Sequence, residues 1–219
     1  MSFVDRSDAG HRLAEALAEY RGRGAVVLAL PRGGVPVARE VAAALGAPLD
    51  LILVRKIGVP MQPELAMGAV VDGSHPLTVR NEDVIGLAGI SEAEFAAIRN
   101  RELEEIRRRR AKYVGNRPHP DLAGRIAIVV DDGIATGATM RAALQAARSQ
   151  GPRKLIVAVP VGPASTIAEL RAEADEVVCL DVRTAFDSIG LYYADFTQVS
   201  DEEVTSILAE FPATLRAEG

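Results

Sequence analysis

The sequence has 219 residues, 48% of them hydrophobic, which is enough to bury one sizeable core, so we expect a single domain over residues 1–219. The formal net charge of −5 excludes the overall positive field that nonspecific nucleic-acid binding requires. The chain has one cysteine, Cys179, and no apolar run near the ~20 residues of a membrane span, so we expect a cytoplasmic protein without a membrane partner.

The predicted elements alternate between helices and strands along most of the chain. Leu13, Leu17 and Tyr20 recur at helical spacing, whereas Val, Ile, Leu and Ala form unbroken runs of strand length. Continuous apolar strands between helices indicate an α/β fold with a parallel, doubly wound sheet flanked by helices. In chain order the pattern predicts a helix at 11–20, a strand at 25–30, a helix at 36–45, a strand at 49–54, a helix at 91–113, a strand at 125–130, a helix at 138–149, a strand at 154–159, a helix at 164–174 and a strand at 176–180.

Residues 55–67 interrupt this alternation. They contain Pro60 and Pro63 and have no usable periodicity, which predicts a mobile loop. Residues 68–71 and 77–79, which follow this loop, could pair as short strands.

The helix at 91–113 is long and charged, and its run Arg107–Arg110 could suggest nucleic-acid binding. Two glutamates, Glu104 and Glu105, stand four residues before two of these arginines, which is the spacing of ion pairs on one helix face. We therefore interpret the segment as a solvated amphipathic helix inserted into the fold. A role in a dimer contact or as a cap over the site stays open.

The strand at 125–130 is followed by Asp-Asp-Gly-Ile-Ala-Thr-Gly-Ala-Thr and then a helix, and ligands of parallel sheets bind at such carboxyl ends. The carboxylates of Asp131 and Asp132 can accept hydrogen bonds from a cis-diol, and the amides of residues 136–139 open a helix whose dipole favours an anion. An ordinary Asp-Gly turn with a threonine helix cap explains neither the paired aspartates nor the two threonines that flank Gly137. We therefore predict a site for the phosphate and ribose diol of a phosphorylated sugar.

The segment Val129–Met140 resembles, over its whole length, the phosphoribosyl-pyrophosphate motif of type I phosphoribosyltransferases. One version of the motif has an aspartate at the position of Ala135 that contacts the purine N7, so the alanine weakens a hypoxanthine or guanine assignment. The resemblance implies that Asp131 and Asp132 hold the ribose 2′- and 3′-hydroxyls and any metal ion. It also implies that the 5′-phosphate is bound by the turn formed by Ala135, Thr136, Gly137, Ala138 and Thr139.

A second glycine-rich turn follows the strand at 25–30. Gly33 and Gly34 expose backbone amides, and Arg32 adds a cation, which together suit a doubly charged phosphate group. Taken alone the turn is a moderate signal, because Gly-Gly turns are common. Its position resembles that of the family's pyrophosphate loop, which implies pyrophosphate contacts by Arg32, Gly33 and Gly34.

The loop at 55–67 begins with two cations, Arg55 and Lys56. In isolation, a solvated loop with surface charges explains them at least as well. Type I transferases carry a flexible loop after the corresponding strand, and its closure excludes water from a cation-like sugar. The resemblance therefore assigns Arg55 and Lys56 to catalysis, and Glu64 could serve as a base or hold the closed loop.

The acceptor pocket is expected under a small hood that the C-terminal residues 181–200 help to build, beside a core at about 10–180. This segment concentrates aromatic residues in a chain that contains only 4% of them. It resembles the end of purine-type transferases, which implies base stacking by Phe186 and Tyr192. Simple packing against the sheet explains each single ring about equally well.

Taken together, the resemblance implies a nucleotide-salvage enzyme that binds phosphoribosyl pyrophosphate with Mg²⁺ and transfers the phosphoribosyl group to a nitrogenous base, releasing pyrophosphate. Mg²⁺ suits the hard oxygens of hydroxyls and pyrophosphate. The expected partners are these small molecules and a second copy of the chain in a homodimer, without nucleic acid. A noncatalytic sensor of the sugar diphosphate, a hydrolase-like salvage activity and the identity of the base stay open.

Overall fold

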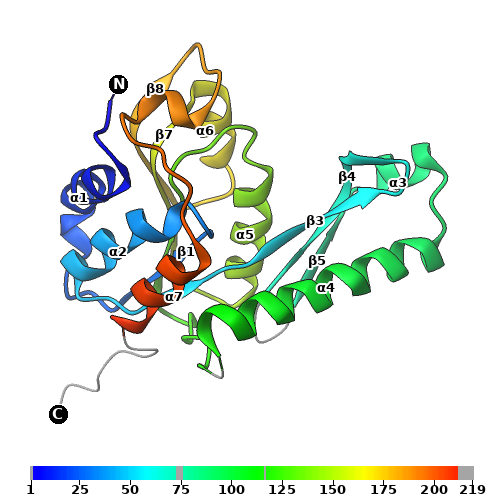
Figure 1. Ribbon diagram of the computed structural model, residues 1–219, viewed down its shortest axis with the longest axis horizontal. Coiled ribbons are helices and arrows are strands. Elements are labelled where there is room, and N and C mark those ends of the chain that lie inside the picture. Colours follow the sequence, from blue (N-terminus) through cyan, green and yellow to red (C-terminus); the bar gives the residue numbers. More distant parts are fainter. Residues whose placement is uncertain (1, 73–75, 116, 212–219) are drawn as a thin grey trace.

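The computed structural model describes residues 2–72, 76–115 and 117–211, except for the side chain of Glu64. Its main sheet has five strands in the order β2–β1–β6–β7–β8, and all neighbouring strands are parallel (Figure 1). This sheet confirms the predicted fold class. The strands are β1 (Ala25–Ala29), β2 (Leu49–Leu51), β6 (Ile126–Val130), β7 (Lys154–Pro163) and β8 (Glu176–Arg183).

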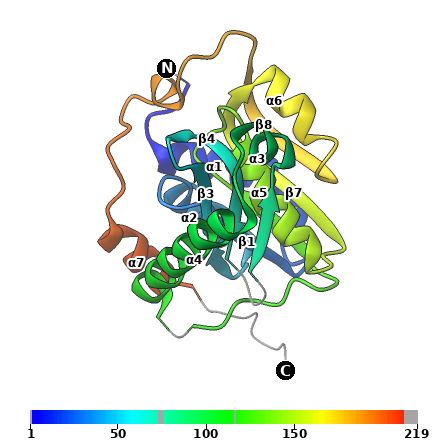
Figure 2. The ribbon, with the colours of Figure 1, turned by 90° about the vertical axis from the view of Figure 1, so that its right-hand side faces the viewer.

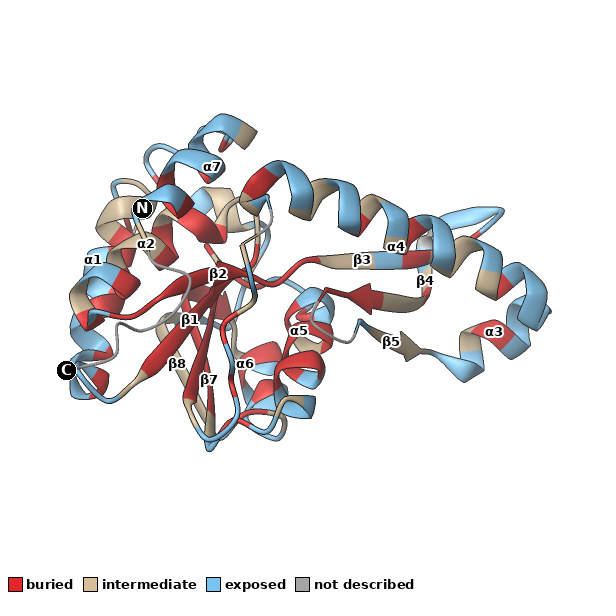
Figure 3. Cartoon of the chain, turned by 90° about the horizontal axis from the view of Figure 1, so that it is seen from below, coloured by how far each residue is buried: buried red, intermediate tan, exposed pale blue. Residues whose placement is uncertain are grey.

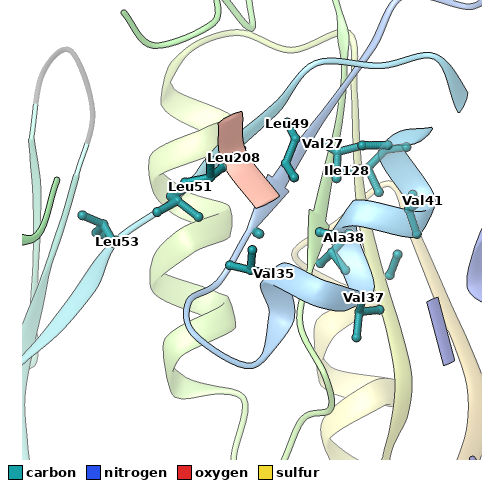
Figure 4. Close-up of a cluster of buried hydrophobic side chains, with 14 of the residues drawn as sticks. Val27, Val35, Val37, Ala38, Val41, Leu49, Leu51, Leu53, Ile128 and Leu208 are labelled. Carbon is teal, nitrogen blue, oxygen red and sulfur yellow. The ribbon is translucent and has the colours of Figure 1, made fainter. Parts of the chain in front are cut away.

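Helices cover both faces of the main sheet. Successive strand residues point to opposite faces, so Val27 and Ile128 enter one apolar cluster and Val26 and Ala127 enter another. Figure 4 shows the first cluster, in which Leu208 lies near the strands. The first cluster includes residues of α1 (Arg6–Ala16), α2 (Gly34–Leu45) and α7 (Asp201–Ala209), and the second includes residues of α5 (Ala138–Ser149) and α6 (Ala164–Leu170).

A three-stranded antiparallel sheet, in the order β3–β4–β5, projects from the main sheet with two helices and forms a small hood (Figures 1 and 2). This hood is built from residues 54–114, and the C-terminal segment 181–200, which was expected to help build one, is not part of this antiparallel sheet. The long charged helix is confirmed, and so is the pairing of residues 68–71 with 77–79. The elements of the hood are β3 (Val54–Val59), β4 (Gln62–Val71), β5 (Leu77–Arg80), α3 (Glu82–Ala88) and α4 (Glu92–Val114).

The prediction of a mobile loop at 55–67 is wrong, because these residues form most of the β3–β4 hairpin. The pairing register shifts on both sides of Gly58, and a β-carbon there would lie 2.5 Å from the Pro63 carbonyl oxygen. A register irregularity breaks the two-residue alternation that identifies a strand in a sequence. The hairpin is nevertheless anchored, since Ile57 and Met67 are fully buried.

The hood buries much less of its surface than the main sheet does, as the colours of Figure 3 show. Along the length of α4, only Phe95, Glu102, Ile106 and Tyr113 are buried. Their spacing places them on one face of the helix, which packs on β3 and β4. The other residues of α4 are exposed or partly buried, which fits the predicted amphipathic helix.

A buried ionic cluster joins α4 to both sheets. The Arg110 guanidinium lies 3.2 Å from Asp50 Oδ2 in β2 and 3.1 Å from Asp72 Oδ2 just after β4, and the two carboxylate side chains are 0% and 8% exposed. His119 Nδ1 lies 3.2 Å from the same oxygen of Asp50. Because buried charges are costly without partners, this cluster fixes the base of the hood against the main sheet.

Two described helices, α3 and α7, were not predicted from the sequence. Each begins with a side-chain cap, since Asn81 Oδ1 accepts a hydrogen bond from the Val84 amide (3.2 Å) and Ser200 Oγ accepts one from the Glu203 amide (3.0 Å). Two short 3₁₀ helices also occur, η1 (Ala18–Tyr20) after α1 and η2 (Ile189–Tyr192) after β8. In the part of the chain that the structure describes, no helix has the length and apolar character needed to cross a membrane.

Candidate functional site

The two loops predicted to bind the sugar diphosphate lie side by side, because they follow neighbouring parallel strands. Ala29 of β1 is in register with Val130 of β6, and the Leu30 amide donates to the Val130 carbonyl (2.9 Å). A β-carbon at Gly34 would lie 2.8 Å from the Asp131 Cα. The backbones therefore approach at a distance that only glycine permits.

The loop after β6 leads into the N-terminus of α5. Gly137 precedes the helix with a φ of 76°, and a β-carbon there would lie 2.7 Å from Thr166 Cγ2. The first amides of a helix have no acceptor within the helix and carry the positive end of its dipole. The exposed residues of this turn are Ala135, Thr136, Ala138 and Thr139. The turn thus offers solvent-facing donors that suit an anion with several oxygens.

Asp131 and Asp132 begin this loop in different surroundings. Asp132 is 7% exposed and Asp131 is partly buried, with Asp131 Oδ1 accepting a hydrogen bond from the Asp132 amide (2.8 Å). Burial and the adjacent Asp132 charge raise the pKa of Asp131 well above its usual value. Burial also raises the pKa of Asp132, against the lowering effect of Arg6. Two poorly hydrated carboxylates side by side are strong acceptors for hydroxyl donors.

Arg6, in the first turn of α1, was not predicted as a site residue. Its Nε donates to Asp132 Oδ2 (2.8 Å), and the two side chains are 11% and 10% exposed. Its Nη1 donates to the Thr197 carbonyl (2.8 Å), and its guanidinium carbon lies 3.9 Å from the centre of the Phe196 ring. Since 126 residues separate Arg6 from Asp132, no local motif could have revealed the pair.

We expect Arg6→Met to lower the free energy of unfolding by about 3 kcal/mol, because it leaves a buried carboxylate without its cation. Urea denaturation measures the loss. Arg12→Met, at an exposed position of the same helix, is the matched control and should have a much smaller effect. In an Asp132→Asn background the effect of Arg6→Met should shrink to about 1 kcal/mol or less, and an undiminished loss there would contradict the coupling.

A pH dependence follows from the raised pKa of Asp131. The folded protein holds this proton more tightly than the unfolded chain does, so the free energy of unfolding falls as the pH rises from the ordinary pKa of 3.8 through the raised one. Asp131→Asn should remove this part of the fall. Urea titrations of both proteins between about pH 4 and pH 8 measure the difference. Parallel stability curves over the whole range would count against the shift.

The aromatic segment after β8 lies against the loop that carries the acids. Tyr193 donates its hydroxyl to the Asp132 carbonyl (2.6 Å), and burial raises the pKa of Tyr193. A β-carbon at Gly133 would lie 2.6 Å from Ile189 Cγ2. The predicted stacking residues, Phe186 and Tyr192, stack on each other with ring centres 5.3 Å apart and planes inclined by 16°. A bound base would have to use an outer face or an edge of this ring pair.

The turn after β1 contacts the acids through its glycines. A β-carbon at Gly33 would lie 2.0 Å from Asp132 Oδ2. The peptide bond between Pro31 and Arg32 is cis. The Arg32 side chain extends toward α7, where its Nη1 lies 3.7 Å from Asp201 Oδ1. The structure therefore places Gly33 and Gly34 beside the acids and directs the Arg32 cation toward the junction with the hood.

Arg55 and Lys56 lie elsewhere, in the hood. They line a cavity of about 600 Å³ between the β3–β4 hairpin and α4, and no residue of the loops at 31–34 and 131–139 lines it. Arg55 donates from Nε and Nη2 to Glu102 Oε2 (2.9 and 2.8 Å). The side chain of Glu64 lies outside the described residues. The predicted catalytic cations are thus not in contact with the predicted sugar-phosphate loops in this conformation.

Asp131 and Asp132 were also the predicted metal ligands. Within residues 2–72, 76–115 and 117–211, no group of three or more His, Cys, Asp or Glu side chains is arranged to hold a metal ion. The two carboxylates do offer the hard oxygens that Mg²⁺ prefers, although Asp132 Oδ2 is bound to Arg6. The donor set therefore fits a magnesium ion that takes most of its ligands from a bound ligand and water.

These features define a doubly wound α/β protein with an exposed turn at the start of α5, paired acids and a small antiparallel hood. The chain belongs to the phosphoribosyl transferase domain family, whose model matches residues 6–195. It is 50% identical over 206 residues to proteins of two Mycobacterium tuberculosis strains, H37Rv and CDC 1551, that are provisionally named as phosphoribosyl transferases. The match covers 94% of this chain but 46% of each relative, so the chain spans about half their length.

A solved structure shows the same fold over nearly the whole chain. The TT1426 protein from Thermus thermophilus is 43% identical and superposes with a TM-score of 0.82. The match covers 96% of this chain and 99% of that one. Both the parallel sheet and the hood therefore fall within the matched region.

Proposed function

We propose that the protein is a phosphoribosyltransferase that binds phosphoribosyl pyrophosphate and transfers its phosphoribosyl group to a nitrogenous base. One observation carries the proposal. The paired acids, the exposed turn at the start of α5 and the glycines after β1 converge at the carboxyl ends of β6 and β1. A diol, a monoester phosphate and a diphosphate carry the groups that such acceptors and donors bind.

The bound sugar would be held from two sides. Asp131 and Asp132 accept hydrogen bonds from the ribose 2′- and 3′-hydroxyls, and the turn at residues 135–139 donates to the 5′-phosphate. The amides of Gly33 and Gly34, with the cation of Arg32, hold the pyrophosphate. Magnesium would be bound by Asp131 and Asp132 together with the oxygens of the sugar diphosphate, and when bound it supplies charge neutralisation for the pyrophosphate.

The proposed reaction is a substitution at the anomeric carbon. A ring nitrogen of the base forms a bond to that carbon as the bond to the pyrophosphate oxygen breaks, and the bonding electrons leave with the pyrophosphate. The proton of the base passes to water or to a carboxylate. The residues of this chain act by positioning the sugar and by stabilising charge on the leaving group. Phe186 and Tyr192 are the proposed contacts of the base.

Arg55, Lys56 and Glu64 enter this proposal only with a movement of the hood. Closure of the β3–β4 hairpin over the bound sugar would bring the cations of Arg55 and Lys56 toward the departing pyrophosphate, and it would exclude water from the anomeric carbon. Arg55 donates two hydrogen bonds to Glu102. Closure therefore either moves Arg55 and Glu102 together or replaces Glu102 with the pyrophosphate as the partner of Arg55.

The test is pyrophosphate release from phosphoribosyl pyrophosphate and Mg²⁺ with a panel of purine and pyrimidine bases, followed by mass spectrometry for the new ribonucleotide. We expect one base to give both products in equal amounts. Incubation with a metabolite extract extends the search to unusual bases. Binding of the sugar diphosphate without release for any acceptor would overturn the transferase proposal. The homodimer is a separate proposal, which a molar-mass measurement by light scattering tests.

A second candidate is a noncatalytic sensor of the same sugar diphosphate. The observation that favours it is the folded hairpin at 54–71, whose Arg55 is tied to Glu102 outside the sugar-phosphate loops. A sensor needs ligand binding and a conformational change, but no cation beside a leaving group. Tight binding with no turnover, together with a ligand-dependent change in hydrogen exchange of the hood, would favour the sensor.

A further inference from the structure

A small basic cavity lies where the hood meets the main sheet. It has a volume of about 210 Å³ and sits between the turn after β1, the C-terminal half of α4 and the start of α7. In Figure 1 the C-terminal end of α4 lies beside α7. The cavity is lined by Arg32, Arg108, Arg109, Lys112, Tyr113 and Asp201. In a chain with a net charge of −5, this concentration of cations is a local exception.

The cations of the cavity outnumber the acids that contact them among the described residues. Glu105 binds both Arg108 and Arg109, with its carboxylate oxygens 2.8 Å from each Nε. Asp201 lies 2.6 Å from Lys112 Nζ. These contacts lower the pKa of both acids to about 2, so each carries a full negative charge. Four cations, counting that of Arg32, thus meet two carboxylates, which leaves two positive charges for a ligand.

The floor of the cavity is fixed, whereas its cations can adjust. Tyr113 is 6% exposed and donates its hydroxyl to Asp201 Oδ1 (2.6 Å). The Arg108 and Lys112 side chains are 68% and 48% exposed, and the weak contact of Arg32 with Asp201, at 3.7 Å, is easily exchanged. Arginine forks match the oxygens of phosphate, and an excess of two charges matches a phosphate dianion better than a single carboxylate.

We propose that this cavity binds a phosphate group. Arg32, which lines the cavity, also belongs to the turn after β1. Gly34 of that turn contacts Asp131 and is only two residues, at most about 7 Å of chain, from Arg32. The phosphate could therefore be the outer one of a sugar diphosphate held by that turn, or it could belong to a separate phosphorylated ligand. Either source uses the same chemistry, and the binding itself requires no transfer reaction.

Calorimetry with inorganic pyrophosphate tests the cavity directly. The double variant Arg108→Gln/Arg109→Gln should weaken the affinity at least tenfold, because both changes remove donors and charge from the cavity. Arg107→Gln is the matched control, since Arg107 lies on the same helix, pairs with Glu104 and does not line the cavity. It should change the affinity less than twofold. Equal losses in the two variants, or no binding to the unmodified protein, would overturn the proposal.

Two further ligands identify the source of the phosphate. If the cavity holds the outer phosphate of the sugar diphosphate, the double variant should bind phosphoribosyl pyrophosphate more weakly and ribose 5-phosphate with unchanged affinity. Inorganic pyrophosphate should then compete with the sugar diphosphate for binding. If the ligand is separate, pyrophosphate and the sugar diphosphate should bind together. The variant Asp131→Asn/Asp132→Asn should no longer bind ribose 5-phosphate but should still bind pyrophosphate. Failure of the transferase proposal is therefore distinguishable from failure of this one.

Discussion

Asp131→Asn combined with Asp132→Asn is expected to weaken the binding of ribose 5-phosphate by about 100-fold or more. Each charged acceptor contributes about 1.5–3 kcal/mol to a hydrogen bond with a ribose hydroxyl, and an asparagine amide replaces an ionic acceptor with a neutral one. Calorimetry at neutral pH measures the change. Turnover with phosphoribosyl pyrophosphate and the accepted base should fall by at least the same factor.

The fold should survive this double change, because asparagine keeps the volume of aspartate. Asp83→Asn, at an exposed position of α3, is the control and should leave affinity unaltered. Because Arg6 would lose its charged partner Asp132, urea denaturation of the double variant must accompany the binding data. A stably folded double variant with unchanged affinity would show that the acids do not hold the sugar.

Gly33→Ala is the second change for which we expect a large effect. The new methyl group would lie 2.0 Å from Asp132 Oδ2, so either the turn or the carboxylate must move. Gly33 has a φ of −59°, which alanine adopts freely, so the effect would come from the collision alone. We expect the affinity for ribose 5-phosphate to fall at least tenfold and the free energy of unfolding to fall by about 1–3 kcal/mol.

Gly86→Ala is the matched control for this substitution. Gly86 lies within α3, and a β-carbon there would meet no described atom within 4 Å. Alanine is favoured over glycine inside a helix by about 0.5–1 kcal/mol, so this variant should be slightly more stable than the unmodified protein. If Gly33→Ala behaved like Gly86→Ala in both measurements, the close approach of the turn to Asp132 would be disproved.

Most of the main sheet could be predicted because its signals are local. The runs at β1 and β6 are buried on both faces, so each reads as an unbroken apolar stretch between helices. The glycine turn and the Asp-Asp motif follow those runs directly in the sequence. Their contact in space then follows from the pairing of two parallel strands.

The hood was harder to predict, because its pattern is weak. The β3–β4 hairpin contacts two helices, α4 and α5, and the register irregularity at Gly58 interrupts its alternation. The prolines at 60 and 63 then favoured a loop. The turn at residues 60 and 61 and the start of β4 accommodate both prolines.

Long-range partners of the site could not be predicted at all. Arg6 and Tyr193 hold the two sides of Asp132, yet neither belongs to a motif, and each is more than 60 residues from the acid. The same limit applies to the basic cavity. The Glu105–Arg109 pair of α4 was predicted from four-residue spacing, whereas Glu104 pairs with Arg107 instead of Arg108. The approach of Arg32 and Asp201 to that helix depends on the complete fold.

The contacts around Asp132 have a consequence for synthesis of the chain on the ribosome. Arg6 emerges first, the acid follows 126 residues later, and Tyr193 and Phe196 come some 60 residues after that. At a synthesis rate of about 5–20 residues per second, several seconds pass between the synthesis of the loop and that of Tyr193 and Phe196. A growing polypeptide can therefore contain every residue of the sugar-phosphate motif before the motif is held in shape.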